Sequence, residues 1–223
     1  MPGTTFEQEI EIIVEDIGGG GGKPPAHDGG GDDGGGKRRR PWNPSPRRYY
    51  TGVTLGILSI LMFFMALASA FIVRRGSSSN DWVPVHIPTI LWLNTAVLLF
   101  SSLTLELARK RLASADLSGF RRLWTVTTFL GLLFLAGQIL AWRQLIREGI
   151  FVATNPGSSF FYVFTGLHGL HLLGGVGALM YVALRNFERA KMTRQVAAEI
   201  VGHYWHFMDA LWVFLLALLY LGK

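Results

Sequence analysis

Residues 160–184 read FFYVFTGLHGLHLLGGVGALMYVAL, and residues 196–221 read VAAEIVGHYWHFMDALWVFLLALLYL. Each segment is longer than the about 20 apolar residues that an α-helix needs to cross the hydrocarbon core of a bilayer. Both segments also contain ionisable side chains, which are costly at membrane depth and usually have a role there. These side chains are His168, His171, Glu199, His203, His206 and Asp209. The two segments therefore predict membrane-spanning helices and a candidate site in the same place.

The composition of the whole chain is typical of a membrane protein. Half of the 223 residues are hydrophobic and only 16% are charged, against about 25% charged residues in a typical soluble domain. The apolar residues form long runs, which indicates an all-α, polytopic membrane protein. Much of the net charge of +6 comes from Lys and Arg beside these runs, so it reflects membrane topology and no nucleic-acid partner is expected. The absence of Cys excludes disulfides and thiolate metal sites.

Residues 1–48 differ from the rest and predict a disordered tail. They combine an acidic segment, FEQEIEIIVEDI at residues 6–17, with runs of Gly that cannot bury enough apolar surface to fold. The acidic start is unlike a secretory signal peptide, in which a basic region precedes a short apolar run. Six Lys and Arg between residues 37 and 48 precede the first apolar run, which is typical of a juxtamembrane anchor.

Five apolar segments predict five membrane-spanning helices. Their approximate bounds are 49–73, 87–108, 123–146, 158–184 and 196–221, so residues 49–223 form one transmembrane domain. The connections are short, and short connections make successive helices antiparallel neighbours in an up-and-down bundle. Tryptophans, most of them near span ends or polar turns, are expected to form interfacial belts. They are Trp82, Trp92, Trp124, Trp142, Trp205 and Trp212.

The distribution of Lys and Arg predicts the orientation of the bundle. Fifteen lie just before the first span, between the second and third, and between the fourth and fifth, whereas five lie on the other side. Cytoplasmic loops of membrane proteins are enriched in Lys and Arg. The N-terminus is therefore expected in the cytoplasm and the C-terminus on the outer side.

The ionisable residues of the last two spans fall on defined helix faces. Glu199, His203 and His206 are spaced by four and three residues, which places them on one stripe of the fifth span. His168 and His171 are three residues apart and share a face of the fourth span. Antiparallel packing of the two helices would let these faces meet.

Depth along the helices predicts one particular contact. His171 lies 13 residues before the cytoplasmic end of the fourth span, and Asp209 lies 13 residues after that of the fifth, so both are about 20 Å deep. Antiparallel helices would place them level. We therefore predict a hydrogen bond between the His171 imidazole and the Asp209 carboxylate.

Four histidines and two carboxylates are compatible with three interpretations. They could ligate iron or haem, although a carboxylate-bridged di-iron bundle uses Glu-x-x-His pairs and none occurs here. They could carry protons, although the outer halves of both spans are mainly apolar and do not continue a path. The interpretation that fits best is a buried polar lock, in which the six side chains satisfy one another and fix the register of the two helices.

Polar residues also lie within the earlier spans. Glu106 is near Arg109 and Lys110, and we expect its carboxylate to reach the cytoplasmic membrane surface. Asn94 and Gln138 are mid-span amides, which are typical of hydrogen bonding between helices.

Three motifs, in this order, resemble a known family. They are IPTILWLNTAVLLFSS at residues 87–102, TGLHGLH at 165–171, and YWHFMDALW at 204–212, the last preceded by Glu199. Together they closely resemble subunit III of the haem-copper terminal oxidases, the cytochrome c oxidase family. The resemblance covers about residues 50–221 and leaves out the tail.

The resemblance implies a non-catalytic core subunit of a bacterial respiratory enzyme that reduces oxygen to water and pumps protons. In the family, subunit I holds the haems and a copper, subunit II receives the electrons, and subunit III carries phospholipid and supports subunit I and its proton uptake. We therefore expect this chain in the bacterial inner membrane, without a cofactor of its own, with subunits I and II and phospholipids as partners and cytochrome c as the donor. Arg185 matches a family position that contacts lipid headgroups, and Arg194 is a second candidate.

The chain departs from the family pattern at two points. Family members with seven spans have two further N-terminal helices that form one wall of a lipid-holding cleft, and these are not expected here. The family often has a membrane-embedded Glu in the helix that corresponds to the first span, where this chain reads LSILMFF at residues 58–64. Two alternatives stay open: a subunit III paralogue of a quinol oxidase or nitric-oxide-reductase cluster, and a free-standing membrane haem or metal protein.

Overall fold

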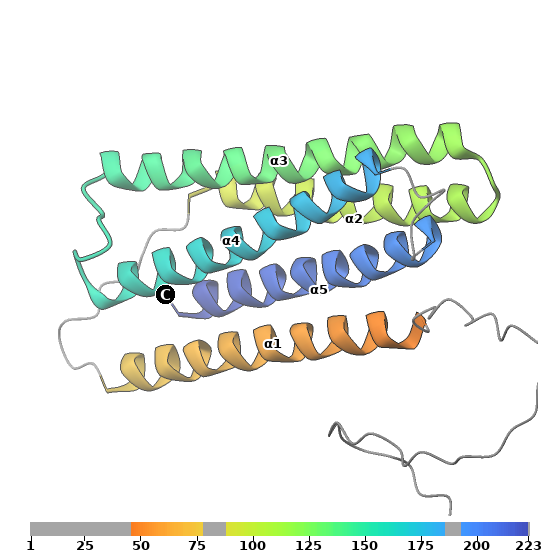
Figure 1. Cartoon of the computed structure of the whole chain (residues 1–223). Helices are drawn as coiled ribbons and strands as arrows, with labels where there is room; N and C mark the ends of the chain where they lie inside the picture. Colours follow the sequence, from red (N-terminus) through yellow and green to blue (C-terminus); the bar gives the residue numbers. More distant parts are fainter. Residues whose placement is uncertain (1–45, 78–87, 186–192, 223) are drawn as a thin grey trace, which may run out of the picture. The chain divides into compact units, whose positions relative to one another are not determined.

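The computed structural model describes residues 46–77, 88–185 and 193–222, and within them the chain forms five α-helices (Figure 1). They are α1 (Pro46–Gly76), α2 (Ile90–Ala113), α3 (Leu117–Arg147), α4 (Pro156–Leu184) and α5 (Arg194–Leu221). Each is long and apolar enough to cross a membrane. The prediction of an all-α protein with five spanning helices is confirmed. The predicted tail, residues 1–48, lies almost entirely outside the described residues and stays a prediction.

Several helices extend beyond the apolar runs that predicted them. α2 continues to Ala113 and α3 begins at Leu117, so basic residues expected in a loop lie on helical turns. They are Arg109, Lys110, Arg111, Arg121 and Arg122. Long basic side chains can hold their charge at the membrane surface while their stems cover apolar groups, so a helix need not end where the charges begin.

Side-chain caps explain where three of the helices begin. The side chains of Asp116, Asn155 and Thr193 each accept a hydrogen bond from the backbone N–H three residues further on, at 2.9, 2.8 and 3.3 Å. Such bonds satisfy one of the unpaired N–H groups of a first helical turn. Pro156 follows Asn155 at the first helical position, where its missing N–H removes no helical hydrogen bond.

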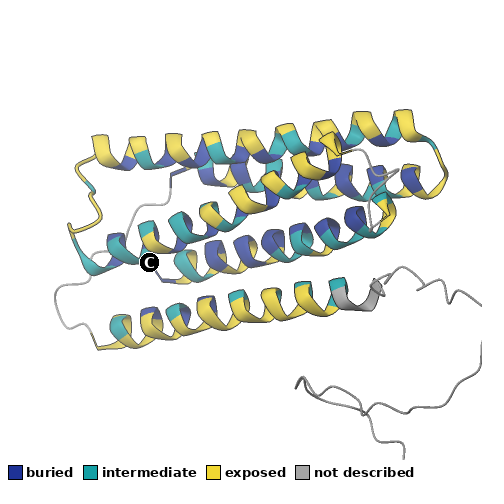
Figure 2. Ribbon diagram, in the orientation of Figure 1, coloured by how far each residue is buried: buried dark blue, intermediate teal, exposed yellow. Residues whose placement is uncertain are grey.

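Four of the helices enclose the core, and α1 lies beside them. α2 packs most extensively on α3, α3 packs on α4, α4 on α5, and α5 in turn on α2. Of the described helices, α1 contacts α4 and α5 only. Buried residues line the inner sides of α2 to α5, whereas α1 is exposed over most of its surface (Figure 2).

The core is rich in aromatic side chains, and Trp205 of α5 lies where two other helices approach it closely. A Cβ atom built on Gly131 of α3 would lie 2.6 Å from Trp205 Cη2. A Cβ atom built on Gly175 of α4 would lie 3.3 Å from Trp205 Cε3. Glycine at these two positions therefore lets the indole ring lie between three helices, where it is fully buried.

Candidate functional site

Two of the six predicted site residues are buried in the bundle. The His168 side chain is 0% exposed, and its ring centroid lies 4.9 Å from that of Trp212 and 5.9 Å from that of Phe134. Asp209 is 4% exposed. Within the described part of the chain, neither the His168 ring nitrogens nor the Asp209 carboxylate oxygens have a hydrogen-bond partner. His168 is therefore held by packing against its aromatic neighbours, whereas the Asp209 carboxylate faces the Ser102 hydroxyl of α2.

The predicted hydrogen bond between His171 and Asp209 is wrong. The His171 Nδ1 atom lies 2.7 Å from the carbonyl oxygen of Leu167 in its own helix. The imidazole ring packs edge-on against Phe64 of α1, with 5.7 Å between the centroids. Counting residues along two helices predicts their relative depth but not the rotation of each helix about its axis, and here the rotation turns His171 toward α1.

Glu199, His203 and His206 share one stripe of α5, as predicted, but the stripe faces away from α4. The side of α5 toward α4 carries Tyr204, whose hydroxyl donates to the His171 carbonyl oxygen at 2.9 Å. His203 is exposed, and its Nδ1 atom lies 2.8 Å from the Glu199 carbonyl oxygen. The six predicted residues are thus divided between the core of the bundle and its outer surface.

The outward stripe of α5 makes polar contacts with α2 and α1. The His206 Nδ1 atom is hydrogen bonded to the Ser102 hydroxyl, and its Nε2 atom lies 3.9 Å from Glu106 Oε2. The Tyr50 hydroxyl of α1 donates a hydrogen bond to Glu199 Oε2. These side chains connect α5 to the two helices on either side of its exposed surface.

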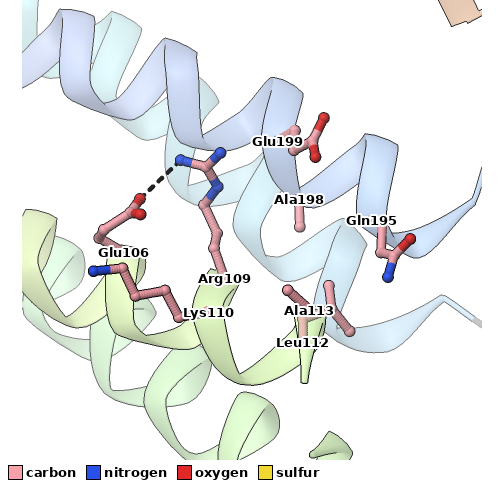
Figure 3. A pocket seen from close by; sticks show the side chains of 8 residues that line it. All are labelled: Glu106, Arg109, Lys110, Leu112, Ala113, Gln195, Ala198 and Glu199. Atoms are coloured by element: carbon pink, nitrogen blue, oxygen red, sulfur yellow. Dashed lines mark hydrogen bonds and ion pairs between the residues drawn. The ribbon is translucent and has the colours of Figure 1, made fainter. Parts of the chain in front are cut away.

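A pocket opens where α2 ends and α5 begins (Figure 3). It has a volume of about 390 Å³ and is lined by Glu106, Arg109, Lys110, Leu112, Ala113, Gln195, Ala198 and Glu199. Arg109 Nη1 donates to Glu106 Oε2 at 2.8 Å, which confirms the predicted proximity of these two residues. The Arg109 stem crosses Gly202, where a built Cβ atom would lie 3.0 Å from Arg109 Cδ. Glycine at this position lets the guanidinium group lie close to α5.

Buried tryptophans link the helices, a role that the sequence prediction missed. Trp205 Nε1 donates to Ser101 Oγ and Trp212 Nε1 donates to Thr95 Oγ1, both at 3.0 Å, and these bonds join α5 to α2. Trp124 donates from α3 to a backbone carbonyl of α4 at 2.9 Å. All three indoles are buried, so the prediction of interfacial belts is wrong for them. Because a buried indole needs an acceptor, hydroxyls at matching spacing in another span were the available signal.

The two mid-span amides behave differently. Asn94 Nδ2 donates to the Phe134 carbonyl oxygen at 3.3 Å, which confirms a hydrogen bond between α2 and α3. A Cβ atom on Gly137 would lie 2.0 Å from Asn94 Oδ1, so glycine makes room for this amide. Gln138 is buried, and its amide has no hydrogen-bond partner among the described residues.

The two candidate lipid contacts lie at the ends of α4 and α5. Arg185 is exposed, and its guanidinium carbon lies 4.9 Å from the centre of the Tyr181 ring. Arg194 is half-buried in the first turn of α5. No group of three or more His, Cys, Asp or Glu side chains is gathered as a metal site requires in residues 46–77, 88–185 or 193–222.

The fold and these contacts define the class of protein: a multi-span helical membrane protein whose polar side chains join helices. Comparison with known proteins then identifies the family. The family model described as "Cytochrome c oxidase subunit III" matches residues 47–222. The chain belongs to this family, which confirms the resemblance carried by the three motifs, and its function is that of a terminal-oxidase subunit III.

Individual relatives agree with the family match. The chain is 35% identical over 182 residues to a "Probable cytochrome c oxidase subunit 3" of Nocardia farcinica, covering 78% of this chain and 88% of the relative. It is 32% identical to a protein of the same description from Mycobacterium tuberculosis, with the same coverage. It is also 32% identical to the "Cytochrome c oxidase subunit 3" of Thermostichus vulcanus, covering 76% of this chain and 85% of the relative. The similarity therefore extends over most of each relative.

Proposed function

We propose that this chain is a non-catalytic core subunit of a proton-pumping oxidase that reduces oxygen to water with electrons from cytochrome c. It associates with subunit I, which carries the haems and a copper, and with subunit II, which receives the electrons. The observation that supports this best is the family match over residues 47–222, which includes nearly all of the five helices. The part assigned to this chain is to stabilise subunit I, its proton uptake and its lipid surroundings.

Purification of the tagged chain from membranes of the source bacterium tests this proposal. We expect subunits I and II, haem and copper to co-purify, and the preparation to consume oxygen when reduced cytochrome c is added. Activity with a quinol instead, together with a copper-free subunit II, would favour the quinol-oxidase paralogue. A haem spectrum or bound metal in the chain expressed by itself would favour the free-standing haem or metal protein.

The polar residues of the last two spans act in this proposal as structural links. The His168 ring packs against Trp212, the His171 carbonyl oxygen accepts from Tyr204, and His206 is hydrogen bonded to Ser102. Each of these contacts joins two helices. They support a lock that extends from α4 and α5 to α2, with Asp209 packed inside it and Glu199 and His203 at its surface.

Asp209→Asn separates a structural role from proton transfer. Asparagine has nearly the shape of aspartate, and burying a neutral amide is less costly than burying a carboxylate, so we expect normal yield of the complex. An amide cannot take up and release a proton, so a proton path through this position would stop. An unchanged rate of oxygen reduction and an unchanged ratio of protons pumped per electron support the lock. Loss of either, in a complex of normal yield and composition, contradicts it.

The proposed membrane is the bacterial inner membrane, with the N-terminus in the cytoplasm. In this orientation the α2–α3 turn and the start of α5 face the cytoplasm, where Arg185 and Arg194 would meet lipid phosphates. Removal of both charges in Arg185→Gln/Arg194→Gln should lower the phospholipid retained by the purified complex. Arg147→Gln, at the opposite end of the bundle, is the control, and equal phospholipid in the two variants would count against this assignment.

A further inference from the structure

Five ionisable residues lie on the outer surface of the bundle where α5 meets α2. We call these side chains the α2–α5 face: Glu106, Lys110, Glu199, His203 and His206. Lys110 and His203 are exposed, and the side chains of Glu106 and His206 are 40% and 38% exposed. Unless protein covers it, such a surface on a spanning helix faces lipid.

Part of this face lies deep in the membrane. α5 has 28 residues and is therefore about 42 Å long, whereas the hydrocarbon core is about 30 Å thick. His206 is twelve residues after Arg194, or about 18 Å along the helix, which places it about 12 Å inside the hydrocarbon. A flexible Lys or Glu can extend to the membrane surface, but the short, rigid imidazole side chain of His206 cannot.

The outer sides of the other helices are different. The central turns of α1, α3 and α4 expose no charged or imidazole side chain in the described residues. Their exposed positions hold residues such as Met62, Phe129 and Leu170, as lipid contact requires. His171, the half-buried histidine of α4, lies against Phe64 of α1. The α2–α5 face is thus the part of the described surface that is least suited to lipid.

We propose that the α2–α5 face docks on a membrane-spanning helix of a partner oxidase subunit. Ionisable groups within a membrane almost always face protein or water and pair with other polar groups, because hydrocarbon offers them no hydrogen bond. The small residue Ala210 is exposed on the same stripe as His203 and His206, one turn deeper, and small residues let helix backbones approach closely. The inference rests on the proposed association with subunits I and II.

The contacts of this face define the chemistry of the partner helix. A backbone carbonyl can only accept, so the His203 Nδ1 atom beside the Glu199 carbonyl oxygen is the donor. In a neutral imidazole the other nitrogen, Nε2, is then an acceptor. Glu106, already paired with Arg109, likewise offers carboxylate oxygens. The partner helix is therefore expected to present hydrogen-bond donors, from Ser, Thr, Asn or Gln, at the level of His203.

Photo-cross-linking in the intact complex tests the docking. Leu103 of α2 is 55% exposed and borders the face, whereas Leu140 of α3 is 53% exposed and follows the exposed Leu133 and Ala136 on its helix. A photoreactive amino acid is placed at either position, and the purified complex is irradiated. We expect the photoreactive residue at position 103 to form an adduct with another oxidase subunit. The photoreactive residue at position 140 should form no such adduct. Equal adducts from both positions, or an adduct from Leu103 with lipid or a second copy of this chain alone, overturn the proposal.

Bulky substitutions provide a second measurement. Ala210 of α5 and Ala136 of α3 are both exposed alanines on spanning helices. Ala210→Trp should block close helix approach and cause loss of this chain from the complex when subunit I is purified through a tag. Ala136→Trp should leave its recovery unchanged. Equal recovery of the two variants contradicts docking at this face, even if both chains fold and reach the membrane.

Failure of this inference can be told apart from failure of the proposed function. Co-purification of the unmodified chain with subunits I and II, without a Leu103 adduct and without an effect of Ala210→Trp, refutes only the position of the interface. Absence of co-purifying oxidase subunits refutes the proposed function itself.

Discussion

Single residues in this bundle matter most where two helices approach closely. Gly131 of α3 faces the Trp205 ring, and a Cβ atom there would lie 2.6 Å from it. In contrast, Gly177 of α4 has nothing within 4 Å of a built Cβ atom. Packing therefore requires glycine at position 131, whereas a methyl group at position 177 would have open space.

We expect Gly131→Ala to destabilise the bundle. The added methyl group must displace a fully buried indole, and overpacking of this kind costs about 1–3 kcal/mol. The purified complex is heated, and the measurement is the temperature at which half of this chain has been lost from the material that stays in solution. Gly177→Ala is the matched control and should leave the midpoint unchanged or raise it, because alanine favours the helix by about 0.5–1 kcal/mol. Equal midpoints for the two variants would contradict the packing argument.

Ser101→Ala removes the acceptor of the Trp205 N–H at 3.0 Å. The indole stays buried with an unpaired donor, for which the penalty is about 1–3 kcal/mol. We expect a lower thermal midpoint for this chain in the purified complex. Ser59→Ala, at an exposed position of α1, provides the comparison and should have little effect. A Ser101→Ala midpoint as high as the wild-type value would show that Trp205 has another acceptor.

At the scale of helices, the turn between α2 and α3 depends on one carboxylate. The pKa of Asp116 is lowered mainly by the hydrogen bond from the Gly119 N–H, and further by the Ser118 hydroxyl and by Arg111. Because the folded pKa lies below the unfolded value of about 3.9, the stabilisation is present above pH 4. It is lost as the pH falls through the folded pKa.

We expect Asp116→Asn to weaken the acid sensitivity of the purified complex. Asparagine is also a good N-cap residue, so stability at neutral pH should change little. As the pH falls below 4, the wild-type complex should lose stability that the Asn variant keeps. Their thermal midpoints, nearly equal at neutral pH, should therefore separate, which thermal unfolding at a series of pH values measures. A constant difference between the two curves at every pH would contradict an effect of Asp116 ionisation.

The sequence predicts helices and their stripes more securely than the direction in which a stripe faces. The apolar runs predict all five spans because length and hydropathy are properties of each segment alone. The spacing of Glu199, His203 and His206 likewise predicts a shared stripe. Whether that stripe meets α4 or faces outward depends on which residues pack better between the helices. Here Tyr204 and Trp205 occupy that side, a choice that local spacing does not reveal.

Helix caps and hydrogen bonds between helices also differ in how well the sequence predicts them. Asp116 and Asn155 precede their helices in sequence, and such caps are readable from local chemistry. The bonds from Trp205 and Trp212 to α2 join residues more than a hundred positions apart. Their acceptors, Ser101 and Thr95, are two of several hydroxyls in α2, and spacing alone does not show which indole each one meets. Long-range pairing of this kind requires the packing of the whole bundle.

At the scale of the whole molecule, the absence of Cys allows a direct test of membrane orientation. Ala115 lies in the α2–α3 turn and Ala153 in the α3–α4 connection, and both are exposed. In right-side-out vesicles, a membrane-impermeant maleimide should label Ala153→Cys and not Ala115→Cys. In inside-out vesicles the labelling should be reversed. The opposite pattern would mean that the N-terminus is on the outer side.

The pairing of α1 with α4 and α5 has a consequence for biogenesis. Near one end of the bundle, Arg75 Nη1 donates to the Leu221 carbonyl oxygen at 2.7 Å, and a Cβ atom on Gly222 would lie 2.5 Å from Phe71 Cζ. The helices that receive α1 are synthesised after α2 and α3, and among the described helices these two offer α1 no contact. Of the five helices, α1 is therefore made well before the two that it packs on, and its packing can be completed only after both of these have been synthesised.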